Sequence, residues 1–425
     1  MNVAASTESP ITIEDREELI FMLCEAAELE HMIMLQYLFA AFSLKRDEDE
    51  GLTPEQLQAC KRWDRAVSAV ASQEMLHLAL CNNLLTAVGG APHFRRPNFP
   101  QRANYFPSGV QFELLPFGER ALRHFIYLER PEGMEEHDAP GFDVTAAPAP
   151  MPTGQEVVPY LQEFATVGHL YRGLEQGFRH LAEKHGEENL FIGPPRAQAV
   201  EAYFRWPDLV AVTDLASAVK AIETIVEQGE GARGHWEEAH YGKFLRIFSE
   251  YQEVTQRDPA FEPARPVQMA WCRIPGTPGV VEPCMIAEQV TAEVADLFNA
   301  SYEILVQMLA RFFAHTEESD EELNTLSDTA VTAMFALIRP LGRIVTRLPV
   351  GPHQPGRTAG PSFEYYRSGY LLPHKEAVWQ VMRERLLELE AACSEIASRP
   401  GAPAGLEKVR QGFHELAEML ARHSA

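Results

Sequence analysis

Apolar residues recur every three or four positions over two long stretches near the start of the chain, 14–45 and 54–88. This spacing is typical of amphipathic α-helices. The second stretch follows Thr53-Pro54, a common way to begin a helix, and it stops at Gly89-Gly90. The pattern therefore predicts two long helices joined by a short charged turn. Their stripes consist of Leu23, Ala27, Glu30, Met34, Tyr37 and Ala41, and of Val67, Val70, Glu74, His77, Cys81 and Leu84.

Residues 91–156 differ from both stretches, because they are rich in proline, glycine, phenylalanine and asparagine. We expect a long connection there with little regular structure. Helical spacing returns at 157–185 and again at 214–252. The last of these contains the glycine-rich run 228–234, where we expect a kink because glycine disfavours a helix interior. Four long helices with a long connection between the second and the third are typical of a ferritin-like four-helix bundle.

The remainder of the chain predicts a second helical unit. Residues 253–283 are rich in proline and read as a linker. The prediction is therefore an all-α fold, with a ferritin-like bundle over 1–260 and a helical C-terminal domain over 261–425. Helical patterns in the second domain fall at about 285–315, 320–346, 374–398 and 404–423.

Glutamate and histidine residues interrupt the apolar stripes at the spacing of metal ligands. Glu74 and His77 form an E-x-x-H motif, and Glu237 and His240 form a second one on the stretch 214–252. Residues i and i+3 share one face of a helix, so each pair can reach one metal ion. Glu30 adds a carboxylate from the first helix. A glutamate on each of two helices and an E-x-x-H on each of two others form the ligand set of carboxylate-bridged dimetal proteins.

Two positions in this ligand set stay open. On the stretch 157–185, Glu175 fits the stripe best, and His169 is the other candidate. On the stretch 214–252, Glu230 lies two turns before Glu237 on the same face, so either or both are candidate ligands.

A simpler interpretation competes with the metal site. A single E-x-x-H arises often by chance in acidic helices, and a glutamate at the edge of a stripe can reach water. Two such motifs on long helices favour metal, because an unpaired carboxylate on an apolar face is costly. Tyr37 and Tyr171 also lie on the stripes and are candidate catalytic residues, although a buried tyrosine with a bonded hydroxyl is the commoner case.

Charge and composition exclude several classes of protein. The formal net charge of the 425 residues is -24, from 61 acidic and 37 basic side chains, which argues against nucleic acid and anionic membranes as partners. No run of about 18 apolar residues predicts a membrane span, and the first residues lack the pattern of a signal peptide. The six cysteines form no C-x-x-C motif, so we expect a reducing, cytoplasmic location.

The sequence around the candidate ligands resembles the ferritin-like domain of the iminophenylpyruvate dimer synthase family, which includes enzymes of violacein and rebeccamycin biosynthesis. The resemblance covers roughly residues 15–250, and the later run GPSFEYY is similar too. The segments that carry it are AAELEHMIMLQYLFAAFSLK, SQEMLHLALCNNLLTAVGG, VGHLYRGLEQGF and IVEQGEGARGHWEEAHYGKF.

The resemblance implies an iron-dependent oxidative enzyme. In named members of that family, an aromatic, amino-acid-derived imine of a pyruvate is coupled to a second copy. Where the family pattern leads us to expect an acidic or amide residue, this chain has His169, which leaves the ligand from 157–185 open. The ligands implied here are Glu30, Glu74, His77 and His240, with a glutamate from Glu230 or Glu237.

We therefore expect a non-haem oxidase or oxygenase with two iron ions, for which manganese could substitute, since it uses the same ligands. Its partners would be dioxygen and a small organic, amino-acid-derived substrate. The alternatives are an iron-oxidising storage protein and a metal-free helical scaffold. A subunit of 425 residues packs poorly into a storage cage, so we expect a monomer or a small oligomer such as a homodimer.

Overall fold

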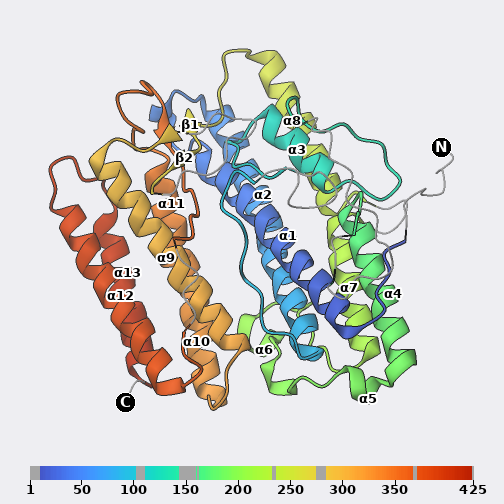
Figure 1. Ribbon diagram of the computed structural model, residues 1–425. Coiled ribbons are helices and arrows are strands. Elements are labelled where there is room, and N and C mark those ends of the chain that lie inside the picture. Colours follow the sequence, from blue (N-terminus) through green and yellow to red (C-terminus); the bar gives the residue numbers. More distant parts are fainter. Residues whose placement is uncertain are drawn as a thin grey trace.

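The computed structural model describes residues 10–101, 111–142, 159, 162–231, 236–273, 284–366 and 371–423. These parts of the chain are mostly helical, which confirms the predicted all-α class (Figure 1). Among the described helices, none combines the length and the apolar character that crossing a membrane requires.

Four helices in the first half of the chain form a bundle. In chain order they are α1 (Arg16–Ser43), α2 (Pro54–Ala87), α4 (Val167–His185) and α7 (Leu215–Gly229). Helix α1 packs against α2 and α4, and α7 packs against the same two helices, so the four enclose a common interior (Figure 1).

Capping residues set where these helices begin. Asp15 accepts a hydrogen bond from the third backbone N–H of α1, and Thr53 forms a capping box with Gln56 at the start of α2. Thr166 caps α4 in the same way, so this helix begins later than the predicted residue 157. Most of the predicted residues 157–161 lie outside the described part of the chain.

The described part of the connection between α2 and α4 contains the helix α3 (Glu119–Leu128), where the sequence predicted little regular structure. Its apolar face is buried, with the Phe125 ring 4.6 Å from Tyr37 and 5.3 Å from Phe244 between centroids. This packing holds α3 against the bundle and against α8 (His240–Arg257). The connection therefore brings an ordered helix to the end of the bundle interior.

The predicted helix at 214–252 is two helices. Instead of the expected kink, the described residues show a break: α7 ends at Gly229, residues 230–231 and 236–239 are not helical, and α8 begins at His240. Gly229 and Gly231 account for the end of α7, since glycine disfavours a helix interior. His240 consequently occupies the first turn of a new helix, and Glu237 lies in the turn that precedes it.

The helices after residue 285 pack on one another, and in Figure 1 they occupy the left side of the molecule. Short elements complete the chain: 3₁₀ turns η1 (Glu48–Glu50) and η2 (Pro195–Ala197), and helices α5 (Glu187–Leu190) and α6 (Glu201–Phe204). Two parallel two-stranded pairs join β1 (Val267–Gln268) to β4 (Thr358–Ala359) and β2 (Ala270–Trp271) to β3 (Cys284–Met285). The later helices are α9 (Gln289–Phe313), α10 (Asp320–Ala333), α11 (Arg339–Val345), α12 (Lys375–Ala397) and α13 (Leu406–Ala421).

A π-helical segment, η3 (Met334–Ile338), joins α10 to α11. Its cause lies in Pro340, which has no N–H to donate and whose ring crowds the carbonyl four residues earlier. The Arg339 N–H bonds to the Met334 carbonyl, five residues back, so the turn is wider than an α-helical one.

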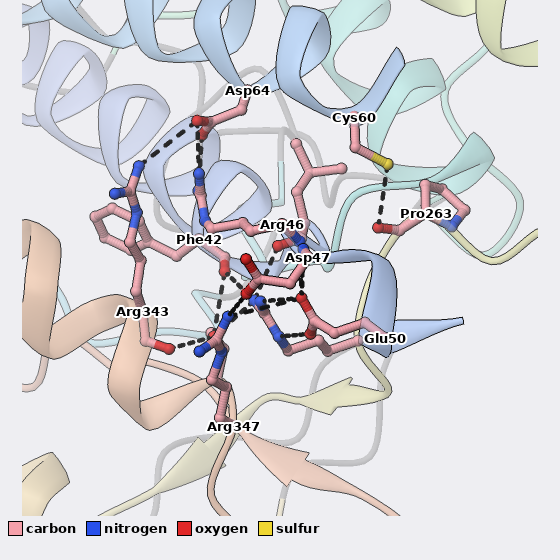
Figure 2. A network of polar contacts seen from close by, with 12 residues as sticks. Phe42, Arg46, Asp47, Glu50, Cys60, Asp64, Pro263, Arg343 and Arg347 are labelled. Carbon is pink, nitrogen blue, oxygen red and sulfur yellow. Dashed lines mark hydrogen bonds and ion pairs between the residues drawn. The ribbon is translucent and has the colours of Figure 1, made fainter. Parts of the chain in front are cut away.

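Charged side chains join α11 to the loop end of α1 and α2 (Figure 2). Arg46 donates hydrogen bonds of 2.7 and 2.8 Å to Asp64, and Arg343 from α11 lies 3.5 Å from the same carboxylate. Arg347 donates to Asp47 at 2.6 Å. These contacts fix the later helices against the open side of the α1–α2 pair.

Candidate metal centre

Four of the predicted ligands meet inside the bundle. Glu30 comes from α1, Glu74 and His77 from α2, and His240 from the start of α8, and their exposed fractions are 2%, 2%, 2% and 0%. Ligand atoms of Glu74, His77 and His240 all lie within 4.8 Å of one another. Such a group of titratable residues in a buried position requires partners or a bound ion.

Glu74 lies at the centre of this cluster. Its Oε2 is 2.8 Å from Nδ1 of His77, and its Oε1 is 2.8 Å from Nδ1 of His240. The two imidazole rings are 5.4 Å apart between centroids. Each carboxylate oxygen therefore faces a different imidazole, an arrangement suited to a carboxylate that bridges two ions.

A second carboxylate lies beside each histidine. Oε2 of Glu30 is 3.5 Å from Nδ1 of His77. On the other side, Oε2 of Glu129 is 3.7 Å from Nδ1 of His240, and Glu129 is only 6% exposed. Glu129 directly follows α3 as its C-cap residue, so the connection between α2 and α4 supplies a carboxylate that we had expected from α4.

The sequence prediction missed Glu129 and placed two glutamates in the set that the structure does not bring to the cluster. Glu175 is 27% exposed and binds Arg179 at 2.7 Å, one turn further along α4. Glu237 is exposed, because the helix break leaves it outside α8. Signals for both outcomes exist in the sequence: an arginine four residues after Glu175, and glycines just before Glu237.

Glu230 and His169 take other positions near the bundle end. Glu230 caps the end of α7, and its carboxylate accepts the backbone N–H of Glu132 at 3.0 Å. A small cavity of about 20 Å³ is lined by Glu230, Glu129 and Tyr171. His169 is buried in the first turn of α4.

Both predicted tyrosines contact carboxylates of the cluster. The Tyr171 hydroxyl donates to Oε1 of Glu30, and Tyr37 donates to Oε1 of Glu129. Both rings are fully buried. Each tyrosine thus holds one oxygen of a flanking carboxylate and leaves the other oxygen facing a histidine.

Glutamine side chains fix the orientation of the two imidazoles. Nε2 of His77 lies 3.1 Å from Oε1 of Gln228, and Nε2 of His240 lies 3.2 Å from Oε1 of Gln73. An amide oxygen only accepts, so each Nε2 carries its proton. In the neutral ring, Nδ1 then directs its lone pair into the cluster, as a metal-ligating histidine requires.

Burial and mutual charge perturb the titration of these groups. Burial raises the pKa of Glu30 to about 7, and burial together with Glu74 raises the pKa of Glu129. Burial opposes the charge on Glu74, but His240 and His77 outweigh it and hold its pKa well below the ordinary range. Burial likewise opposes the charge on His77, yet Glu74 and Glu30 raise its pKa to about 10. Because these groups bind a metal ion in their deprotonated forms, a cation bound here would release protons from them.

The donor set fits a pair of metal ions. It offers three carboxylates and two imidazoles in a site closed to solvent, a combination suited to iron or manganese. Oε1 of Glu74 and Nδ1 of His240 are 2.8 Å apart but form no hydrogen bond of adequate geometry. The two atoms attract each other as an ion pair, and a bound ion would complete their contacts.

Comparison with known proteins gives the same kind of fold. A family model described as ferritin-like matches residues 23–249. The chain is 28% identical over 450 aligned positions to dichlorochromopyrrolate synthase of Lentzea aerocolonigenes, covering 98% of this chain and 42% of that protein. It is 30% identical over 372 positions to 2-imino-3-(indol-3-yl)propanoate dimerase of Chromobacterium violaceum, covering 83% of this chain and 34% of that protein.

The chain thus spans well under half the length of the curated relatives that it matches. Among solved structures, a ferritin-like protein from Caulobacter vibrioides is 19% identical, with a TM-score of 0.46 over 75% of this chain and 96% of that one.

Proposed function

The chain belongs to the ferritin-like family, and we propose that it is an oxidative enzyme that uses a pair of iron ions in the Glu74 cluster. One observation carries the proposal: Glu74 lies between two buried imidazoles, and each imidazole has a second carboxylate at its side. Glu30 and His77 would hold one ion, Glu129 and His240 the other, and Glu74 would be shared. When bound, such ions supply redox chemistry with dioxygen.

The side chains around the cluster would keep its ligands in place. Tyr171 and Tyr37 each fix a carboxylate through a hydroxyl that keeps its proton, because burial raises the pKa of both phenols well above the ordinary value. Each hydroxyl donates its proton to one oxygen of a flanking carboxylate. The cavity lined by Glu129, Tyr171 and Glu230 has room for about one water-sized molecule beside the cluster.

The names of the relatives support a proposal for the substrate class. Their names describe a synthase and a dimerase, the latter acting on an indolyl imino acid. We therefore propose a small, amino-acid-derived organic substrate and a role in biosynthesis. Because the chain spans only 42% and 34% of these relatives, their complete reactions are not assigned to it.

The test measures dioxygen consumption by anaerobically iron-loaded protein after aromatic imino acids are added, with product masses determined in parallel. We expect consumption that depends on the organic compound and is lost in the Glu74→Gln variant. A storage protein would instead take up dioxygen without any organic compound and accumulate many more than two irons per chain. That result, or the absence of any substrate-dependent consumption, would refute the proposed enzyme.

A further inference from the structure

A cavity of about 350 Å³ lies between the α1–α2 pair and the later helices, on the side that the charged contacts of Figure 2 hold together. Its walls are apolar, with Leu35 and Leu38 from α1, Leu78 from α2, and Leu305 and Leu309 from α9. This volume falls within the range of about 300–1,000 Å³ that is usual for small-molecule sites.

The cavity is separate from the metal centre. None of Glu30, Glu74, His77, Glu129 and His240 lines it. Along α2, Met75 and Leu78 line the cavity, whereas their immediate neighbours Glu74 and His77 belong to the cluster. Adjacent helical residues point about 100° apart, so α2 separates the two sites.

At the inner end of the cavity, the polar groups of His31 and Tyr302 are already hydrogen-bonded. Tyr302 donates to Nε2 of His31 at 2.7 Å, and Nδ1 of His31 lies 3.1 Å from the Phe94 carbonyl. Arg96 in turn donates to the Tyr302 hydroxyl at 3.2 Å. These groups satisfy one another. Of the other polar side chains on the described lining, Ser68, Ser72 and Trp206 are uncharged and two are arginines, so recognition of an anionic group falls to the arginines.

Two arginines lie at the mouth of the cavity, Arg65 on α2 and Arg339 at the start of α11. Arg65 is exposed and donates to the Lys61 carbonyl, and no ion pair of its side chain is found within the described residues. In the part of the chain that the structure describes, the ion pair found for Arg339 is the one with Asp64, at 3.9 Å.

Asp64 is already engaged by two other guanidinium groups, those of Arg46 and Arg343 (Figure 2). Burial, together with the neighbouring charges of Arg46 and Arg339, lowers the pKa of Arg343 to about 10. A local excess of positive charge in a chain whose formal net charge is -24 points to an anionic group that is to be bound there.

The π-helical segment η3 forms the remaining edge of the mouth. Met334, Phe335 and Ile338 of this segment line the cavity, and the Phe335 side chain is 64% exposed. Wide turns of this kind occur often at functional sites, and a large exposed aromatic ring beside an apolar cavity offers further surface to a ligand.

We propose that this cavity binds a hydrophobic carboxylic acid, with its hydrocarbon or ring body against the apolar walls and its carboxylate at Arg65 and Arg339. The apolar lining accounts for the body of the ligand, and the unmatched arginines account for its charge. The binding claim does not rest on the proposed oxidative function, because no ligand of the metal centre takes part.

The test is calorimetric titration of the full chain with 2-naphthoate and with its uncharged analogue 2-naphthamide. We expect the acid to bind more tightly than the amide. Arg65→Gln and Arg339→Gln should each weaken naphthoate binding about fivefold, the loss of one solvent-accessible ion pair, and leave naphthamide binding unchanged. Ala69→Trp, at an exposed position of the mouth, should abolish the binding of both compounds.

Two variants serve as controls. Arg62 is a neighbouring arginine of α2 that pairs with Glu250 and does not line the cavity, so Arg62→Gln should leave both affinities unchanged. His77→Ala should bind naphthoate normally, because the metal centre is on the other side of α2. Failure of wild-type protein to bind naphthoate, equal affinities for acid and amide, or loss of binding in His77→Ala would each overturn the proposal.

Discussion

The role of Glu129 gives the sharpest mutational test of the metal centre. The Glu129→Gln variant keeps the shape of the side chain and an oxygen that can accept the Tyr37 hydrogen bond, but it removes the charge. Glu129 lies 3.7 Å from the imidazole of His240, so its charge would act directly on a cation held by His240. At about 4 Å and an effective dielectric constant of about 20, one unit of charge is worth about 4 kcal/mol.

That energy corresponds to a loss of roughly 100- to 1,000-fold in metal affinity, since about 1.4 kcal/mol is tenfold. The variant should lose metal affinity, but the free energy of unfolding of the metal-free protein should not decrease. Burial raises the pKa of Glu129, so its carboxyl group opposes folding when charged, and the metal-free variant should be at least as stable as the wild type. Anaerobic titration with Fe(II) and urea unfolding of the metal-free proteins measure the two effects.

Glu175→Gln is the matched control. Glu175 was the carboxylate expected from α4, but it makes an exposed ion pair with Arg179 that is worth only a few tenths of a kcal/mol. Its variant should bind metal like the wild type. Unchanged affinity in Glu129→Gln, or an equal loss in Glu175→Gln, would show that the connection does not supply a ligand.

Urea unfolding can measure how two further kinds of substitution change the free energy of unfolding. Glu318→Gln leaves the buried Arg311 without its counter-charge and should cost about 3–5 kcal/mol at neutral pH. Burial opposes the charge on Glu318, but Trp379 and Arg311 hold its pKa below the ordinary value of 4.5, so the wild-type advantage should shrink as the pH falls below 4.5. A stability difference between the wild type and Glu318→Gln that does not change with pH would contradict the explanation by the Glu318–Arg311 ion pair. Gly193→Ala would place a Cβ 1.8 Å from the Thr86 carbonyl oxygen and should cost about 3 kcal/mol, whereas Gly118→Ala, where a Cβ meets nothing within 4 Å, should cost far less.

Much of the fold was predictable because helical periodicity is a local property. The stripes on 14–45 and 54–88 correspond to α1 and α2 within two residues at each end, and Thr53-Pro54 begins α2 as expected. The α3 helix is short and lies within a proline-rich connection, and its burial depends on contacts with α1 and α8 that are distant in the sequence. The segment does show helical spacing, with Leu122, Phe125 and Ile126 buried on one face, but over only ten residues this spacing does not reveal which distant elements that face packs against.

The ligands of the candidate site likewise include some that the sequence predicted and one that it did not. Glu30, Glu74 and His77 stand on long, regular helices, so their spacing alone placed them on one face. Glu129 stands at the end of a helix within a connection, where no heptad or four-residue spacing relates it to the other ligands. Only the three-dimensional packing of α3 brings its carboxylate to His240.

The dimetal centre is tested most directly by the metal content of freshly purified and of anaerobically iron-loaded protein. The wild type is compared with the His77→Ala and His240→Ala variants. Since each imidazole would serve a different ion, we predict about two irons per chain in the wild type and loss of bound iron in both variants, with the helical circular dichroism retained. A wild type that holds no metal after loading, or variants that hold as much iron as the wild type, would contradict a dimetal centre at Glu74.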